Sequence, residues 1–325
     1  MSASTSTPRS PLSSSSFSNV NGLLPNAKKY EEINVIGTGA YGTVYKARDL
    51  LNDGHIVAMK KVKVALTEDG IPLSTVREIA LLRQLEAYRH PNIVRLLDVC
   101  HGGQSMERDQ QLVLFLVFEH VEQDLDSFLK RSPGPLSENR IRSMSYDILS
   151  GIDFLHSHRI VHRDLKPHNL LVTRAGRVKL ADFGLAKTYD ADMKLTSVVV
   201  TLWYRPPEVL LGVSYNTAVD VWSCGCVLAE LHTRAPLMPG TSDSEQLHCI
   251  FRLLGRPSRF EWPDNVSILP DSFPDYPPKN LADVIPNIHP DALDLIRRML
   301  VFDPAKRLTA LDCLEHPYFT DEPLM

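Results

Sequence analysis

The pattern of apolar and polar positions divides the chain into two parts of different character. Residues 31–118 contain short apolar or alternating runs typical of strands, interrupted by one helical pattern from Thr75 to Glu86. After a connector at 119–123, apolar residues recur at helical spacing, at Ile141, Met144, Ile148, Ile152 and Leu155. Further helices are predicted over 219–231 and 291–300. The pattern predicts an α+β protein with a small β-rich part and a larger, mostly α part.

Composition marks a tail at the N-terminus and a proline-rich segment within the helical part. Residues 1–29 are rich in Ser, Thr, Pro and Asn without an apolar period, so we expect a disordered tail. Within it, Thr7-Pro8 and Ser10-Pro11 fit either phosphorylation by a proline-directed kinase or a plain solvated tail. We place the β-rich part at 30–121, the helical part at 122–319 and a short C-terminal tail at 320–325. The proline-rich residues 263–290 predict a long surface insertion of unknown role.

Charge and cysteine content narrow the class of protein. A net charge of -4 without any Lys/Arg-rich block gives no reason to expect nucleic acid as a partner. Cys224 and Cys226 form a C-x-C inside an apolar helical stretch, which favours buried reduced thiols over a zinc site. The longest wholly apolar run, 112–118, is too short to span a bilayer, and the first residues lack the apolar core of a signal peptide. We therefore expect a soluble intracellular protein that does not bind membranes.

Two short motifs bring together the groups that phosphoryl transfer requires. His162-Arg163-Asp164 is followed by Asn169, and Asp182-Phe183-Gly184 comes shortly afterwards. An aspartate in this setting can act as the base for an attacking hydroxyl, while an amide and a carboxylate supply hard oxygen ligands for magnesium. The motifs therefore predict a site for phosphoryl transfer.

A glycine-rich segment, residues 37–42 with the sequence GTGAYG, fits two kinds of phosphate site. A dinucleotide-binding turn would need Gly42 to open a helix, whereas Thr43-Val44-Tyr45 favours a second strand. The glycines are therefore expected in a hairpin whose backbone N–H groups can approach phosphate oxygens.

Lys60 ends the apolar run that begins at Ile56, and Glu78 follows in the predicted helix. A kinase needs such a pair, because the lysine holds the α and β phosphates and the glutamate fixes the lysine. Each residue also has a plainer interpretation. Lys60 could be a solvated strand-end lysine, and Thr75-x-x-Glu78 fits a helix capping box, which would exclude the pairing.

Several longer segments extend this comparison. PLSTVRE at 72–78 resembles the signature helix of cyclin-dependent kinases, in the form carried by the branch that uses D-type cyclins. LVFEHVEQDL, HRDLKPHN, KLADFGLAK and LTSVVVTLWYRPPEVLL are also similar to that family, and the resemblance covers roughly Tyr30 to Phe319. It implies a bilobal protein kinase fold, with a small β-rich N-lobe carrying one regulatory helix and a larger, mostly α C-lobe.

The resemblance also implies ATP, Mg2+ and particular roles for the motif residues. Asp164 would orient the attacking hydroxyl and accept its proton, Lys166 would neutralise the migrating phosphoryl group, and Asn169 and Asp182 would bind magnesium. Lys60, Glu78 and Thr201 complete the expected catalytic set. The nucleotide would contact Ile36, Gly37, Gly39, Gly42, Val44, Ala58, Lys60, Leu171, the backbone of Glu119 and Val121, and Asp124 near the ribose or solvent, with Phe118 closing the pocket. For the apolar residues among these, ordinary strand or core packing is the alternative.

Regulatory residues follow from the same comparison. Thr196 lies at the usual position of an activating phosphate, with Arg77 and Arg163 as cations to bind it. The family's third cation is normally an arginine, but this chain has Lys187, which cannot form a bidentate fork. Tyr41 resembles an inhibitory phosphorylation site, although it fits equally a tyrosine that covers the hairpin. Two further departures are His168 in place of glutamate or glutamine and Pro206 in place of alanine.

Partners and targets complete what the resemblance implies. The resemblance implies that Leu73 and Val76 contact a cyclin of the D type, whose docking would push Glu78 toward Lys60. The alternative is a helix whose apolar residues all pack inside the protein's own core. Val199 and Val200 occupy the positions that imply Ser-Pro and Thr-Pro substrates. The resemblance further implies a role in G1 phase, inhibitor proteins as partners, and a location in the nucleus and cytoplasm. Two competing classes are a catalytically dead kinase-like scaffold and a nicotinamide dehydrogenase built on the glycine pattern.

Overall fold

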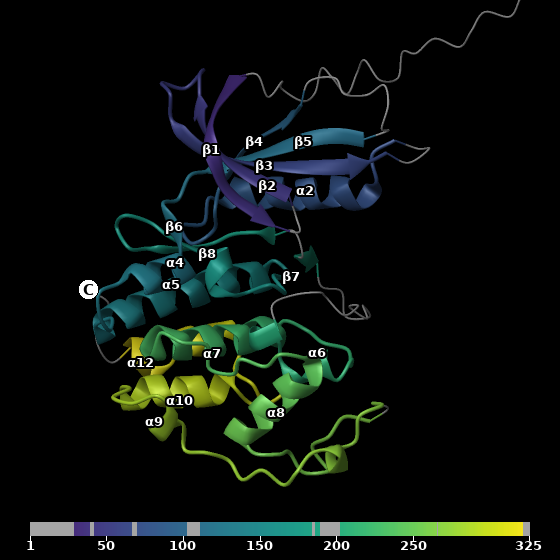
Figure 1. Ribbon diagram of the computed structural model, residues 1–325, viewed down its shortest axis with the longest axis vertical. Coiled ribbons are helices and arrows are strands. Elements are labelled where there is room, and N and C mark those ends of the chain that lie inside the picture. The colour runs from purple at the N-terminus through teal and green to yellow at the C-terminus, as the bar shows by residue number, and fades with distance from the viewer. Residues whose placement is uncertain are drawn as a thin grey trace, which may run out of the picture. The chain divides into compact units, whose positions relative to one another are not determined.

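The computed structural model describes residues 29–39, 42–66, 70–102, 111–183, 186–188, 202–264 and 266–320 (Figure 1). The chain forms two compact units, the first from residues 1–77 and 96–120 and the second from 78–95 and 121–325. The first is built on an antiparallel sheet and the second is mainly helical, which confirms the predicted α+β class. The helix that was expected to belong wholly to the β-rich part, α2, contributes residues to both units.

The first unit is a five-stranded antiparallel sheet in the order β1-β2-β3-β5-β4. Its strands are β1 (Tyr30–Gly39), β2 (Gly42–Asp49), β3 (Ile56–Ala65), β4 (Leu96–His101) and β5 (Gln111–Glu119). One face of the sheet forms a core of Tyr30, Ala47, Val57, Met59, Cys100, Phe115 and Val117. Because side chains alternate between the two faces of a strand, the even-numbered positions of β3 belong to the opposite face.

The glycine segment forms the predicted hairpin, since Gly39 pairs with Gly42 and β2 continues as a strand. The dinucleotide-binding turn, and with it the dehydrogenase interpretation, is therefore wrong. Gly42 has φ of 121°, and a Cβ at this position would lie 2.2 Å from the carbonyl oxygen of Lys61. The hairpin thus requires glycine at position 42.

We expect Gly42→Ala to lower the free energy of unfolding by about 1–3 kcal/mol, because the substitution adds a strained backbone conformation to a collision with main-chain atoms. Gly134→Ala is the matched control, since a Cβ at Gly134 meets nothing within 4 Å. Urea unfolding measures both variants. Equal stability of the two would show that the hairpin is not held as described.

Helix α2 (Leu73–Tyr88) is longer at both ends than the predicted 75–86. It begins two residues before Thr75, and the N–H of Val76 donates to the carbonyl oxygen of Pro72. Thr75 therefore lies inside the first turn and cannot be the N-cap, so the capping-box interpretation of Glu78 is wrong.

The second unit packs its helices around a core that is mainly apolar and also contains buried charged groups such as Asp220 and Arg307. Its helices are α4 (Leu125–Arg131), α5 (Glu138–Ser157), α6 (Pro207–Leu210), α7 (Ala218–Thr233), α8 (Asp243–Leu254), α9 (Leu281–Val284), α10 (Pro290–Met299), α11 (Ala310–Leu314) and α12 (Pro317–Thr320). Short strands β6 (Gln123–Asp124), β8 (Leu170–Val172) and β9 (Val178–Leu180) form one sheet, and β7 (Ile160–Val161) pairs with β10 (Lys187–Thr188). The five apolar residues predicted to line a helix are all buried on α5, as expected from their spacing.

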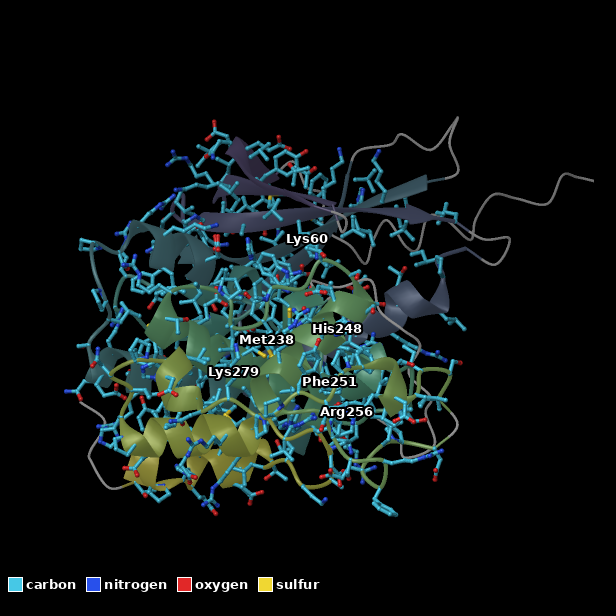
Figure 2. The ribbon with its side chains drawn as sticks, turned by 60° about the horizontal axis from the view of Figure 1, so that its bottom comes forward. Lys60, Met238, His248, Phe251, Arg256 and Lys279 are labelled. Carbon is cyan, nitrogen blue, oxygen red and sulfur yellow. The ribbon has the colours of Figure 1, made fainter. Side chains whose placement is uncertain are left out.

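The proline-rich segment after α8 is attached to that helix by aromatic and polar contacts. Phe251 on α8 packs edge to face against Phe273 with ring centroids 4.9 Å apart. Arg256 donates from Nη1 to the carbonyl oxygen of Pro270 at 3.1 Å, and His248 Nδ1 lies 3.1 Å from the Tyr276 hydroxyl (Figure 2). The insertion is therefore tied back onto the second unit at several points along its length.

The remaining composition-based expectations concern thiols and membranes. All five cysteines are free, and Cys224 and Cys226 are buried within α7, as predicted. In the described part of the chain, no helix combines the length and the apolar character needed to cross a bilayer.

Candidate active site

Asp164 lies in the loop between β7 and β8. One of its carboxylate oxygens accepts two hydrogen bonds, and the other accepts none from the described residues. Oδ2 accepts from Lys166 Nζ at 2.9 Å and from Asn169 Nδ2 at 3.0 Å. Oδ1 is buried and has no hydrogen-bond partner among the described residues. A buried carboxylate oxygen without a donor is costly unless a ligand supplies one. The geometry thus leaves one oxygen of Asp164 ready to accept a proton or hydrogen bond from a substrate hydroxyl.

Burial raises the pKa of Asp164, and the hydrogen bond from Lys166, with the positive charges nearby, only partly offsets this effect. A raised carboxyl pKa brings the group closer to neutral pH, where it is a better proton acceptor. Lys166 therefore serves two purposes in this loop, since it orients Asp164 and also keeps the carboxylate charged.

Asp220 on α7 holds the backbone of the loop that contains Asp164. Sequence reasoning missed this residue. Its carboxylate accepts the N–H of His162 at 2.8 Å and that of Arg163 at 2.9 Å. His156 Nε2 lies 3.0 Å from the same carboxylate. Burial by itself would raise the pKa of Asp220, but the hydrogen bond from His156 and those from the loop hold that pKa below its usual value.

His162 connects this loop to the segment that carries Asp182. Its Nε2 lies 3.0 Å from the carbonyl oxygen of Ala181, and its Nδ1 accepts the N–H of Asp164 at 3.3 Å. Arg163 and Asp182 both have left-handed backbone conformations, with φ of 69° and 61°. Such conformations cost about 1–3 kcal/mol each in residues other than glycine and are concentrated at functional sites.

Asn169 and Asp182 are suited to hold a magnesium ion. Asn169 Nδ2 donates to the carbonyl oxygen of Asp164 at 2.7 Å as well as to its carboxylate, which orients the amide and leaves its oxygen for a cation. The N–H of Ala181 donates to the carbonyl oxygen of Asn169 at 2.9 Å, so the residue next to Asp182 is tied to this loop. The described residues contain no group of three or more His, Cys, Asp or Glu that could hold a metal. An ion bound here by one carboxylate and one amide fits Mg2+, which takes its other ligands from phosphates and water.

In the first unit, the expected nucleotide contacts share one face of the sheet. Val44 pairs with Lys60, Lys60 with Leu116, and Ala58 with Phe118, and directly paired residues project on the same face. Gly37 pairs with Val44 and so belongs to this set, whereas Ile36 lies at an irregularity in the β1–β2 register and is 46% exposed. This face is opposite the buried core of the unit. The Lys60–Glu78 pair stays a prediction, because the two residues belong to different units.

Asp124 has a structural role that sequence reasoning missed. It is the N-cap of α4 and accepts both the N–H and the hydroxyl of Ser127 at 2.8 Å. The other predicted nucleotide contacts lie nearby in the sequence of elements. Leu171 on β8 pairs with Asp124 on β6. Glu119 is the last residue of β5, and Val121 is the first residue of the following part of the second unit. His168 Nε2 lies 3.5 Å from Oδ2 of Asp126 on α4, and the ammonium group of Lys130 contacts the same oxygen.

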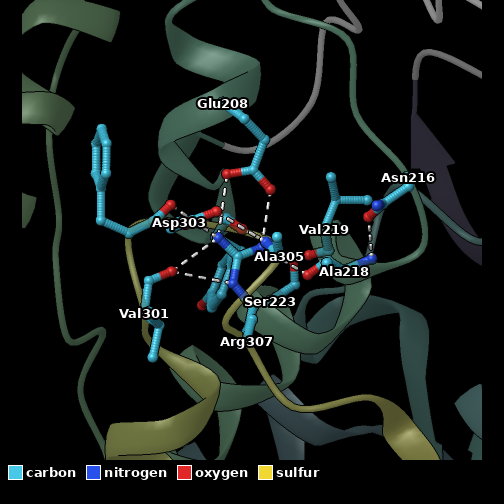
Figure 3. Close-up of polar contacts among 11 residues, drawn as sticks. Glu208, Asn216, Ala218, Val219, Ser223, Val301, Asp303, Ala305 and Arg307 are labelled. Carbon is cyan, nitrogen blue, oxygen red and sulfur yellow. Dashed lines mark hydrogen bonds and ion pairs between the residues drawn. The ribbon is translucent and has the colours of Figure 1, made fainter. Parts of the chain in front are cut away.

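A buried ion pair anchors the residues that follow the expected activating segment. Glu208 on α6 accepts from Arg307 Nη1 at 2.8 Å and from Nη2 at 3.1 Å (Figure 3). Arg307 also donates to the carbonyl oxygens of Ala218 and Val301, and its guanidinium lies 5.1 Å from the ring centre of Trp222. Both charged side chains are almost fully buried. The chain after position 201 is thereby fixed to α7 and to the segment before α11.

Several predicted residues lie outside the described residues, namely Tyr41, Thr196, Val199, Val200, Gly184 and Thr201. Lys187 is placed only by its backbone, which pairs with Val161 in β7. Arg77, Leu73 and Val76 are exposed on α2, and Arg163 Nη1 lies 3.4 Å from the Tyr215 hydroxyl. Pro206 forms the N-cap of α6 in an extended conformation, which proline favours.

Comparison with known families agrees with this arrangement. Residues 30–319 match the protein kinase domain. The chain belongs to the protein kinase family.

The relatives narrow the assignment further. Cyclin-dependent kinase 4 of Xenopus laevis is 51% identical over 296 residues, covering 91% of this chain and 92% of that protein. The mouse protein of the same name, from Mus musculus, is 49% identical over 300 residues, with 91% and 98% covered. That of Ovis aries is 50% identical over 294 residues, with 89% and 96% covered. The chain is therefore a cyclin-dependent serine/threonine protein kinase that uses ATP and acts in the cell cycle, as the motifs predicted.

Proposed function

We propose that this kinase transfers the γ-phosphoryl group of ATP to Ser-Pro and Thr-Pro sites in proteins that control entry into the cell cycle in G1. The observation that carries the catalytic part is the unpartnered Oδ1 of Asp164, whose other oxygen is held by Lys166 and Asn169. That oxygen accepts the proton of the substrate hydroxyl. Lys166 neutralises charge on the transferred group, and Lys60 binds the α and β phosphates.

Magnesium, when bound, screens the negative charge of the phosphates, and Asn169 and Asp182 are the residues that would hold it. Gly37, Gly39 and Gly42 bring the hairpin backbone to the phosphates, while Val44, Ala58, Phe118 and Leu171 provide apolar contacts for the base. Thr201 is the remaining residue of the proposed catalytic set. These roles rest on the residue chemistry and on similarity to the family.

A cyclin of the D type is the proposed activating partner. Leu73 is 69% exposed and Val76 is 47% exposed on α2, so two apolar side chains are available on one segment of that helix. Exposed apolar residues grouped on a helix are typical of docking surfaces. The helix also carries Glu78, so a partner that binds here can change the position of that carboxylate. We also propose inhibitor proteins as partners at the same surface. The proposed location of the kinase is the nucleus and the cytoplasm.

Substrate choice and partner dependence can be tested together. The chain, purified with and without a D-type cyclin, is assayed with magnesium, ATP and a peptide library that varies the residue after the phosphoacceptor. We expect a strong preference for proline and low activity without cyclin. A library profile without proline preference contradicts the substrate assignment, whereas high partner-free activity contradicts only the regulatory one.

We expect Thr196→Ala to lower the activity of the cyclin-bound kinase by at least about tenfold, because a phosphate at this position would pair with Arg77 and Arg163 and order the segment. Lys187→Arg is expected to strengthen the effect of phosphorylation, since arginine can bind phosphate through two N–H groups. Turnover after treatment with an activating kinase measures both changes. Undiminished turnover of Thr196→Ala in the presence of cyclin would rule out this regulation.

A further inference from the structure

The C-terminal end of α4 lies beside an arginine whose charge is not balanced by a carboxylate. Arg234 Nη2 donates to the carbonyl oxygen of Leu129 at 2.6 Å and to that of Ser132 at 2.7 Å. Its Nε is buried and has no acceptor, and Arg234 forms no ion pair with any residue that the structure describes. Only neutral oxygens therefore meet this guanidinium. Arginine at such a position is a strong site for an anion that can approach it.

The position of this arginine is fixed by its own backbone. Arg234 is the C-cap of α7 in a left-handed conformation with φ of 60°, and its N–H donates to the carbonyl oxygen of Glu230 at 2.7 Å. Glu230 is the nearest acidic side chain on α7, and it accepts the Tyr204 hydroxyl at 2.7 Å. The guanidinium is thus held at the end of α4 while the neighbouring carboxylate is engaged elsewhere.

Ser132 is the residue that could place an anion there. It is the C-cap of α4 in an extended conformation, with φ of -64° and ψ of 129°, and its hydroxyl donates to the carbonyl oxygen of Phe128 at 2.8 Å. Pro133 follows it, and outside residues 1–28 no other serine or threonine in the sequence precedes a proline. Arg131 and Pro133 on either side are exposed, and helix ends open locally at low cost.

We propose that Ser132 is a phosphorylation site for a proline-directed protein kinase and that Arg234 binds the resulting phosphate. In the reaction, Ser132 Oγ forms a bond to the γ-phosphorus of ATP while the bond from that phosphorus to the β–γ bridging oxygen breaks. ADP leaves, and the hydroxyl proton passes to the base of the acting kinase. This inference goes beyond the proposed function, because here the chain is the substrate.

The charge balance explains why the arginine is needed. A phosphate at a helix C-terminus is disfavoured by the helix dipole, and modification also removes the hydrogen bond from Ser132 to Phe128. Lys130 cannot fully offset this cost, because its ammonium group is bound by Asp126 at 2.7 Å. Arg234 already donates to the carbonyl oxygen of Ser132, so its N–H groups are close enough to form charge-assisted hydrogen bonds with a phosphate on that residue. The modified side chain would join the ends of α4 and α7, which Arg234 already bridges.

The modification can be tested in the full chain carrying Thr7→Ala and Ser10→Ala, so that Ser132 is the one remaining serine or threonine before a proline. A purified mitogen-activated protein kinase with ATP and magnesium serves as the proline-directed probe, and mass spectrometry locates the phosphate. We expect stoichiometric phosphate at Ser132, and a rate at least about tenfold lower in Pro133→Ala, which removes the proline signal. Absence of phosphate in the folded chain, while a peptide of residues 126–138 is phosphorylated, overturns the proposal.

A second measurement tests the role of the arginine. Treatment with a broad-specificity phosphatase should release phosphate from Ser132 about tenfold faster in Arg234→Gln than in the wild-type chain, because charge-assisted hydrogen bonds hold the phosphate in the latter. Arg131→Gln, which changes an exposed arginine next to Ser132, is the matched control and should have a smaller effect. Equal release rates in all three proteins overturn the clamp. If Arg234→Gln does not fold, a phosphorus NMR titration of the phosphorylated wild-type chain measures the second pKa of the Ser132 phosphate. Binding to arginine should lower this pKa below the value of about 6 for a free phosphoserine, and an unchanged pKa overturns the clamp.

Discussion

Asp164→Asn is expected to lower turnover of the cyclin-bound kinase by about 10²–10⁴-fold, with little change in the KM for ATP. The substitution keeps the size of the side chain and its hydrogen-bonding capacity toward Lys166 and Asn169, but it removes the basic oxygen. Only the step that moves the hydroxyl proton depends on that oxygen. Steady-state kinetics with a Ser-Pro peptide separates turnover from nucleotide binding.

The control for this variant is Asp264→Asn, which makes the same chemical change at an exposed carboxylate in the insertion. It should retain full activity. If Asp164→Asn also retained full activity, the buried unpartnered oxygen would have no part in the reaction and the assignment of the base would be wrong.

Arg307→Gln should destabilise the second unit by about 3–5 kcal/mol, because it leaves Glu208 as an uncompensated buried charge. The same change removes the hydrogen bonds to Ala218 and Val301 and the contact with Trp222. Glu208 follows the segment that contains Thr196, so activity should be lost together with stability. Denaturant unfolding followed by tryptophan fluorescence measures the change, since Trp222 lies against the mutated group.

The comparison variant for this prediction is Arg259→Gln, at an exposed arginine on the turn after α8. It should change stability by less than about 0.5 kcal/mol, as is usual for surface positions. A similarly small effect of Arg307→Gln would mean that the buried pair contributes nothing to holding α6 against α7.

The parts of the fold that follow from local pattern were predictable, and those that depend on distant partners were not. The apolar run that ends at Lys60 predicted a strand there. Helical spacing predicted α5 with its buried apolar residues, because that pattern reports which side of a helix faces the core. The start of α2 was misjudged, because the carbonyl oxygen of Pro72 already accepts the first helical hydrogen bond, from the N–H of Val76. The capping box that was the alternative interpretation of Glu78 is wrong for the same reason.

The candidate site shows the same division. The motifs identified Asp164 and Asn169 by type and spacing, and the structure brings these two together. Asp220 and Arg307 were missed, because they act across 58 and 99 residues of sequence and nothing local marks them as partners. The cap formed by Asp124 could have been found, since aspartate is among the residues preferred immediately before the first residue of a helix. The roles of Thr196, Thr201 and Tyr41 stay predictions, because these residues lie outside the described ones.

The most direct test of the central claim is transfer of labelled γ-phosphate from ATP to a Ser-Pro peptide by the cyclin-bound chain, compared with its Asp182→Asn variant. If Asp182 holds the metal that binds the phosphates, the wild-type chain transfers the label and the variant loses activity by orders of magnitude. Full activity of Asp182→Asn would contradict the account.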